Sequence, residues 1–161
     1  MVVAVCKGGI YMTHHAIDVA RWLLRRNEQE KLLGDAENIT NLKLQKLLYY
    51  VQGIYLAMYG IPLFEEKLEA WTHGPVVPEI YQEYKCFGSN GIDDPNPPFC
   101  TFSKNEENVM EWVYNEFGQY TAWKLRNMTH QEDPWMMTPQ CSVIDNELIK
   151  KYFEENYIEE A

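Results

Sequence analysis

Four histidines are the side chains of this 161-residue chain best suited to metal binding or acid–base catalysis: His14, His15, His73 and His130. No HExxH motif is present, and no spacing of Cys and His matches a zinc site. His130 is followed by Glu132 and Asp133, so a metal or hydrolytic site would form if the fold brought His73 beside them. The simpler interpretation is that His130 caps a helix or bonds a backbone carbonyl.

Other common catalytic arrangements are absent from the sequence. There is no G-x-S-x-G motif, P-loop or GxGxxG, and Ser103 and Ser142 are better explained as helix caps. The acidic pairs, such as Glu65-Glu66, are neighbours in sequence whose side chains point apart, which is typical of solvated charge. The sequence therefore predicts neither an enzyme nor a cofactor.

A different set of residues stands out, because aromatic, Gly and Pro residues recur in predicted loops: Trp71, His73, Gly74, Pro75, Pro134 and Trp135. A tryptophan in a loop needs a hydrogen bond for its N–H and burial for its ring. These residues therefore either pin the loops in one shape or form a shaped surface that binds another protein, since Trp and Tyr are favoured binding anchors.

The strongest helix signal lies between Thr40 and Gly60, beside these loops in sequence. Its apolar residues form one stripe: Leu44, Leu47, Leu48, Val51, Ile54, Tyr55 and Met58. Lys43 and Lys46 lie near its start, where the helix dipole slightly disfavours positive charge. One explanation is that a lysine there reaches an acidic partner.

The remaining patterns predict a mainly α fold in a single compact domain of about six helices. Alternation near residues 65–73 predicts a small β hairpin or ribbon. The other helices are expected from Thr13 to Arg26, from Pro78 to Phe87, from Ser103 to Gly118, from Thr121 to Met128, and from Asp145 to Phe153. We expect residues 1–12 to be an irregular leader and residues 13–161 to be the domain.

Composition restricts the class of partner. The net charge is −10, which argues against nucleic-acid binding, and no apolar run is long enough to span a membrane. Residues 1–50 carry seven basic and five acidic side chains, whereas residues 51–161 carry seven and nineteen. This acidic excess either keeps the protein soluble or attracts a basic partner. The four cysteines contain no CxxC pair, and we expect a cytoplasmic protein.

Three ordered motifs together resemble the Panacea domain family, which includes SocA-like antitoxins and phage-associated GepA-like proteins. They are LQKLLY at 44–49, AWTHGPV at 70–76 followed by Tyr81, and Leu125 with Thr129-His130 and Pro134-Trp135 before a final helix ending in Tyr152-Phe153. The motifs span about residues 14–153, which is most of the chain.

The resemblance implies an antitoxin that neutralises a toxin by direct protein contact. It further implies that the toxin is encoded by an adjacent gene and that some members deliver their toxin to an ATP-dependent protease. It transfers no catalytic residue. The predicted partner-binding residues are Lys46, Tyr49, Trp71, His73, Gly74, Pro75, Tyr81, His130 and Trp135.

Two alternatives remain open at this point. One is a small hydrolase or metal-dependent enzyme that uses His73 and His130 with the nearby acids. The other is a nucleic-acid-associated regulator that uses the basic first helix, with Arg21, Arg25 and Arg26.

Overall fold

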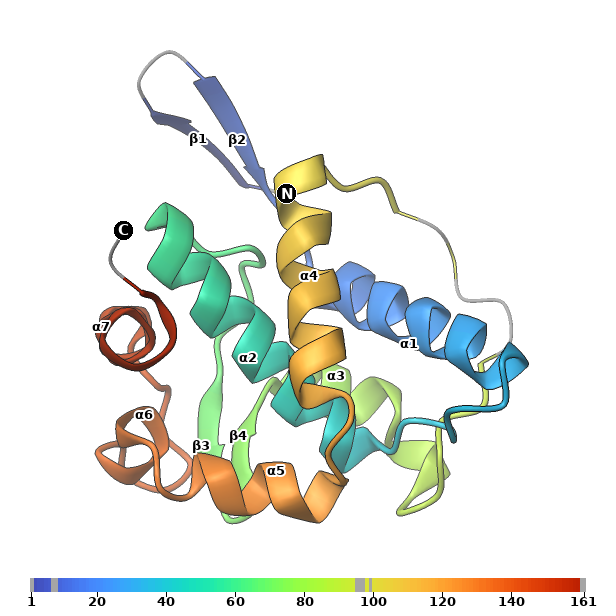
Figure 1. The fold of residues 1–161 in the computed structure, drawn as a ribbon. Helices are drawn as coiled ribbons and strands as arrows, with labels where there is room; N and C mark the ends of the chain where they lie inside the picture. The colour runs from blue at the N-terminus through green and yellow to red at the C-terminus, as the bar shows by residue number, and fades with distance from the viewer. Residues whose placement is uncertain (1, 7–8, 95–97, 99, 160–161) are drawn as a thin grey trace.

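A central helix surrounded by shorter helices and a β hairpin forms the body of the protein (Figure 1). The computed structural model describes residues 2–6, 9–94, 98 and 100–159, and the side chains from residue 13 onward. The helices are α1 (Ala16–Leu32), α2 (Asn41–Tyr59), α3 (Pro78–Glu83), η1 (Lys85–Phe87), α4 (Lys104–Phe117), α5 (Ala122–Thr129), α6 (Asp133–Met136) and α7 (Asn146–Tyr157). The strands are β1 (Val2–Cys6), β2 (Gly9–Thr13), β3 (Glu69–Trp71) and β4 (Gly74–Val76).

Helix α2 is the centre of the core. Every residue from 44 to 56 is buried, and the helix packs against α1, α4, α5, α7 and β4. A helix in such a position is expected to be hydrophobic on most of its faces. The predicted ends are confirmed, because the Thr40 side chain accepts a hydrogen bond from the backbone N–H of Lys43, and Gly60 ends the helix at a φ of 74°.

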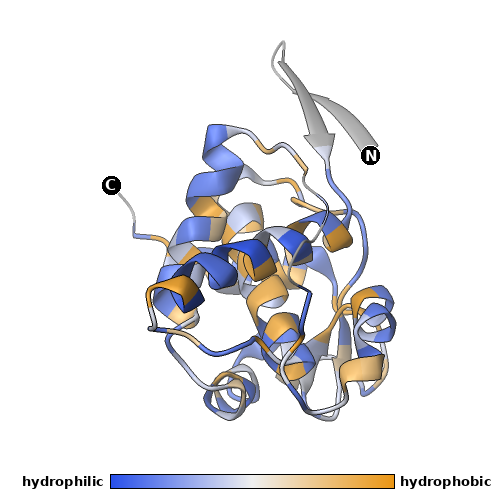
Figure 2. Ribbon diagram, turned by 90° about the vertical axis from the view of Figure 1, so that its right-hand side faces the viewer, coloured by the Kyte–Doolittle hydropathy of each residue, from blue (hydrophilic) through white to orange (hydrophobic). Residues whose placement is uncertain are grey.

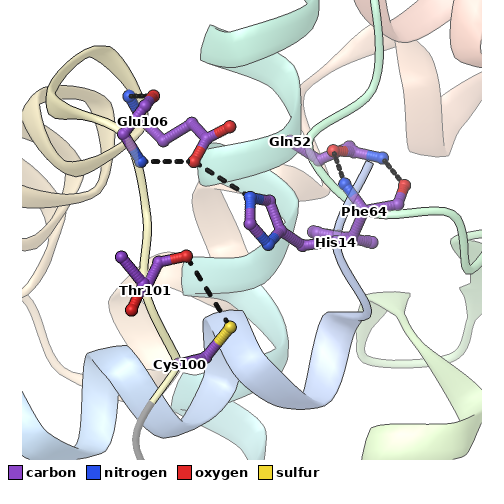
Figure 3. Close-up of polar contacts among 7 residues, drawn as sticks. His14, Gln52, Phe64, Cys100, Thr101 and Glu106 are labelled. Atoms are coloured by element: carbon purple, nitrogen blue, oxygen red, sulfur yellow. Dashed lines mark hydrogen bonds and ion pairs between the residues drawn. The ribbon is translucent and has the colours of Figure 1, made fainter. Parts of the chain in front are cut away.

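The polar side chains inside α2 tie neighbouring backbone segments to it. Gln52 bonds to both the N–H and the C=O of Phe64, at 3.3 and 2.9 Å (Figure 3). Gln45 accepts a hydrogen bond from the N–H of Val77 at 2.9 Å. These bonds fix the two ends of the segment that contains the β3–β4 hairpin, because buried amides cost free energy unless they are hydrogen bonded.

The predicted mainly α fold with a small hairpin is confirmed. Strands β3 and β4 are antiparallel, with Trp71 opposite Gly74 across a two-residue turn. The hairpin covers residues 69–76 and so extends further along the chain than the predicted 65–73. Its second strand, β4, contains Pro75, which is tolerated because β4 is an edge strand where a missing N–H does little harm. The segment near Val143 lies along the other side of β3, since Ala70 exchanges backbone hydrogen bonds with Cys141 and Ser142.

The N-terminal segment differs from expectation. Strands β1 and β2 pair over residues that we expected to be irregular, and Thr13 ends β2, whereas we expected it to cap α1. The cap is His15 instead, because the preceding His14 is held by its backbone to Leu63 and Glu65. Helix α1 therefore begins at Ala16.

The His14 side chain fastens this segment to the start of α4. His14 Nε2 lies 2.9 Å from Glu106 Oε2, and both side chains are buried (Figure 3). Glu106 also completes the predicted capping box by accepting a hydrogen bond from the N–H of Ser103. Burial alone would raise the pKa of Glu106, but the hydrogen bonds from His14 and Ser103 outweigh it and lower the pKa.

The outer helices bury one face each. Hydrophobic and hydrophilic residues alternate along their ribbons in Figure 2, as expected for helices between core and solvent. The single turn α6 was not predicted as a helix, since four residues carry no readable periodicity. None of the helices in the described ranges has both the length and the apolar composition that crossing a bilayer requires.

Candidate functional site

The turn between β3 and β4 brings the second and third sequence motifs together. Three tryptophans, one histidine and one arginine surround it, and we call this set the turn surface: Trp71 and His73 of the hairpin, Trp123 and Arg126 of α5, and Trp135 of α6. Figure 1 shows the hairpin turn lying beside α5, at the opposite end of the molecule from β1 and β2.

The half-buried tryptophans hold the turn in one shape. The indole N–H of Trp135 donates a hydrogen bond to the backbone oxygen of Trp71 at 2.7 Å. The His130 ring stacks on Trp135 with centroids 3.9 Å apart, and Trp71 meets Tyr81 edge-on at 5.1 Å. The expectation that these loops are pinned through their tryptophans is met at Trp71 and Trp135.

Lys46 lies beneath the turn and not on its surface. Its side chain has no solvent exposure, and its Nζ donates a hydrogen bond to the backbone oxygen of Pro75 at 2.9 Å. Burial, with a contribution from the positive charge of Arg126, lowers the pKa of Lys46 to about 7. The structure thus differs from the prediction that Lys46 reaches a partner, since a side chain without exposed area has no surface to offer.

Gly74 makes this close packing possible. Its φ of +103° is one that L side chains rarely adopt. A Cβ atom there would lie 2.6 Å from Thr129 Oγ1 and 2.8 Å from Lys46 Cε. Gly74 and Pro75 are both buried, so they shape the turn surface from within.

Tyr49 lies in the core and is not part of the exposed turn surface. It has no exposed area and packs edge-on against Tyr50 and Phe153. Close by, the buried carboxylate of Glu132 accepts hydrogen bonds from Tyr50 at 3.2 Å and from Tyr157 at 2.5 Å. Burial raises the pKa of Glu132 despite these bonds.

Sequence reasoning missed two residues of the turn surface, Trp123 and Arg126. Trp123 is 56% exposed, and the Arg126 guanidinium carbon lies 4.5 Å from the centroid of its ring. Arg126 Nε donates to His73 Nδ1 at 3.4 Å. One signal in the sequence could have found Trp123. This residue lies in α5 but outside the apolar stripe of that helix, which begins at Leu125.

The histidines of the alternative enzyme hypothesis have other contacts. His73 bonds Arg126, while His130 stacks on Trp135 and lies at the C-terminal cap of α5, where the simpler interpretation placed it. Within the described part of the chain, no group of three His, Cys, Asp or Glu side chains converges to hold a metal ion.

Comparison with known proteins places the sequence of this chain in a family. The family described as "Antitoxin SocA-like, Panacea domain" matches residues 44–136, from α2 to α6. Antitoxin SocA of Caulobacter vibrioides (strain NA1000 / CB15N) is 49% identical over 53 residues. Those residues are 33% of this chain and only 27% of that antitoxin. No solved structure matches. Since the family match covers more than half of the chain, the chain belongs to the SocA-like Panacea domain family.

Proposed function

We propose that this chain is an antitoxin-like binding module that neutralises a partner toxin by direct contact through the turn surface. The observation that carries the proposal is a partly exposed cluster of tryptophan and arginine within the family match. Trp, Tyr and Arg are the residue types that most often dominate the energetics of protein interfaces.

The hydrogen bonds that hold the turn in one shape support this role. Trp71 and Trp135 are fixed by their hydrogen bond, and the turn is held from below by Lys46 and Gly74. A surface that is ordered before binding loses less conformational entropy when the complex forms. We therefore assign contact to the turn surface and a supporting role to the buried residues.

The predicted partner-binding residues divide accordingly. Those proposed to contact the toxin are Trp71, His73 and Trp135, joined by Trp123 and Arg126. Those proposed to support the surface are Lys46, Gly74, Pro75, Tyr81 and His130. Tyr49 belongs to the core and is given no contact.

The family resemblance extends the proposal to the partner. We propose that the toxin is encoded by an adjacent gene, that residues 13–161 form the binding domain, and that the complex is a substrate for delivery to an ATP-dependent protease. Similarity to an antitoxin supports a role without catalysis. The proposed basic DNA-binding face is not supported at Arg26, which is neutralised by Glu30 and Glu111.

Growth rescue tests the proposal. The neighbouring gene is induced in a host with and without this chain, and we expect the wild-type chain to restore growth. Trp123→Ala removes an exposed ring of the turn surface and should abolish or strongly reduce rescue. Trp112→Ala is the matched control, because Trp112 is 44% exposed on α4. If Trp123→Ala restores growth as fully as Trp112→Ala does, at equal protein levels, the turn surface is not part of the interface with the toxin.

A further inference from the structure

Arg126 carries a positive charge that no carboxylate neutralises within the described residues. Its Nε donates to His73 Nδ1 at 3.4 Å, and its Nη1 donates to Asn127 Oδ1 at 3.0 Å. Its guanidinium lies against the ring of Trp123. Among the ion pairs of the described ranges, none includes Arg126.

Arg26 shows what a paired arginine looks like in the same protein. Its guanidinium lies 2.6 Å from a Glu30 oxygen and 2.9 Å from a Glu111 oxygen. The chain has 24 acidic residues against 14 Lys and Arg, so carboxylates are abundant. An arginine without a carboxylate partner among the described residues of such a chain is therefore a distinctive feature of the turn surface.

Other basic side chains lie around Arg126. Lys46 lies below the turn, and burial followed by the charge of Arg126 lowers its pKa. Burial also lowers the pKa of His130, with further contributions from Arg126, Lys46 and His73. The protonated forms of these groups repel one another, and a negative charge placed among them would reduce that repulsion.

The hydrogen-bonding capacity of Arg126 points to the chemistry of what binds there. A guanidinium has five N–H groups, and only two are used by His73 and Asn127 within the described residues. The remaining N–H groups can donate to both oxygens of a carboxylate in a bidentate arrangement, with the Trp123 ring as one wall.

We propose that the turn surface binds an acidic segment of the partner protein, with an Asp or Glu carboxylate of that segment bound by Arg126 beside Trp123 and His73. This inference rests on the proposed function and specifies the partner's chemistry at the contact. The net charge of −10 suggests a basic partner for the chain as a whole. At the turn surface, the Glu69 carboxylate accepts a hydrogen bond from the Trp71 indole N–H at 3.3 Å, whereas Arg126 offers a positive group that has no carboxylate partner within the described residues. A nucleic acid fits less well, because its charge at every nucleotide would be repelled by the acidic remainder of the chain.

Binding to the purified product of the adjacent gene provides the first test. Arg126→Gln should raise the Kd at least about tenfold, and Arg126→Glu should raise it further. Lys104→Glu is the control, since it makes the same charge reversal on an exposed residue of α4. The inference is refuted if the wild-type chain binds and Arg126→Glu, shown to be folded by its unfolding curve, binds equally well.

A second measurement does not depend on the toxin. In ¹H–¹⁵N spectra, a hexaglutamate peptide should shift the indole signal of Trp123 and the Nε–H signal of Arg126, and Arg126→Gln should remove the Trp123 shift. Absence of these shifts, or larger ones with a single-stranded oligonucleotide of equal charge, overturns the inference. Failure of the wild-type chain to bind the gene product, with the peptide shifts present, would instead count against the proposed function.

Discussion

Replacing Lys46 by Met tests whether a buried, titratable amine supports the turn surface. Lys46 is fully buried, donates one hydrogen bond to the backbone oxygen of Pro75, and has a pKa of about 7. Met has a similar length and no charge, so Lys46→Met removes the titration while largely preserving the volume.

The expected effect is a change in how stability depends on pH. An unfolded lysine titrates near pH 10.4. Between that pH and about 7, the unfolded wild-type chain binds a proton that the folded chain does not. Its free energy of unfolding therefore rises with pH across this window, relative to that of Lys46→Met. With a limiting slope of about 1.4 kcal/mol per pH unit, the difference should change by about 2 kcal/mol between pH 7 and pH 9.

Urea unfolding at pH 7, 8 and 9 measures this difference directly. Comparing the two proteins at each pH cancels the titration of tyrosines and other groups that they share. Lys85→Met is the control, because Lys85 is exposed and its replacement should leave the pH dependence of wild type nearly unchanged. If the difference between wild type and Lys46→Met stays constant from pH 7 to pH 9, the reasoning about Lys46 is wrong.

Two further predictions concern the supports of the fold. Gly74→Ala should lower the free energy of unfolding by about 2–3 kcal/mol, because of its positive φ and the close approach of Thr129; Gly88→Ala, at a positive φ in open space, should cost less in the same urea assay. Glu106→Gln should make the stability of the protein fall less steeply with decreasing pH than that of the wild-type chain. The lowered pKa of Glu106 gives stability that is present above about pH 4.3 and is lost as the pH falls further, as measured by thermal unfolding between pH 6 and pH 3; parallel profiles for the two proteins would contradict this.

Much of the fold could be predicted because its signals are local. The stripe of α2, the cap at Thr40 and the capping box at Ser103 depend on residues within a few positions of one another. The cap of α1 could not be predicted in this way. Thr13 pairs with Val2 of β1, and the backbone of His14 pairs with Leu63 and Glu65, about 50 residues away. These pairings override the local preference for Thr at a cap.

The sequence predicted which residues lie close together at the turn better than it predicted which of them are exposed. The motifs named Trp71, His73 and Trp135, which the structure gathers at one turn. The position of Lys46 near the start of α2 predicts a lysine that reaches an acidic partner, whereas in the structure its amine is buried and bonds the backbone oxygen of Pro75. Arg126 was missed because the property that distinguishes it, the absence of a carboxylate partner within the described residues, depends on the spatial arrangement of several elements.

Hydrogen exchange on the complex tests the central claim most directly. The chain is mixed with the purified product of the adjacent gene, and the exchange of backbone amides is compared between the free and bound chain. We predict slower exchange in the complex at residues 71–73 of the hairpin turn and at the exposed start of α5 around Trp123. A complex in which these amides exchange as in the free chain, with protection elsewhere, would contradict the assignment of the turn surface as the binding site.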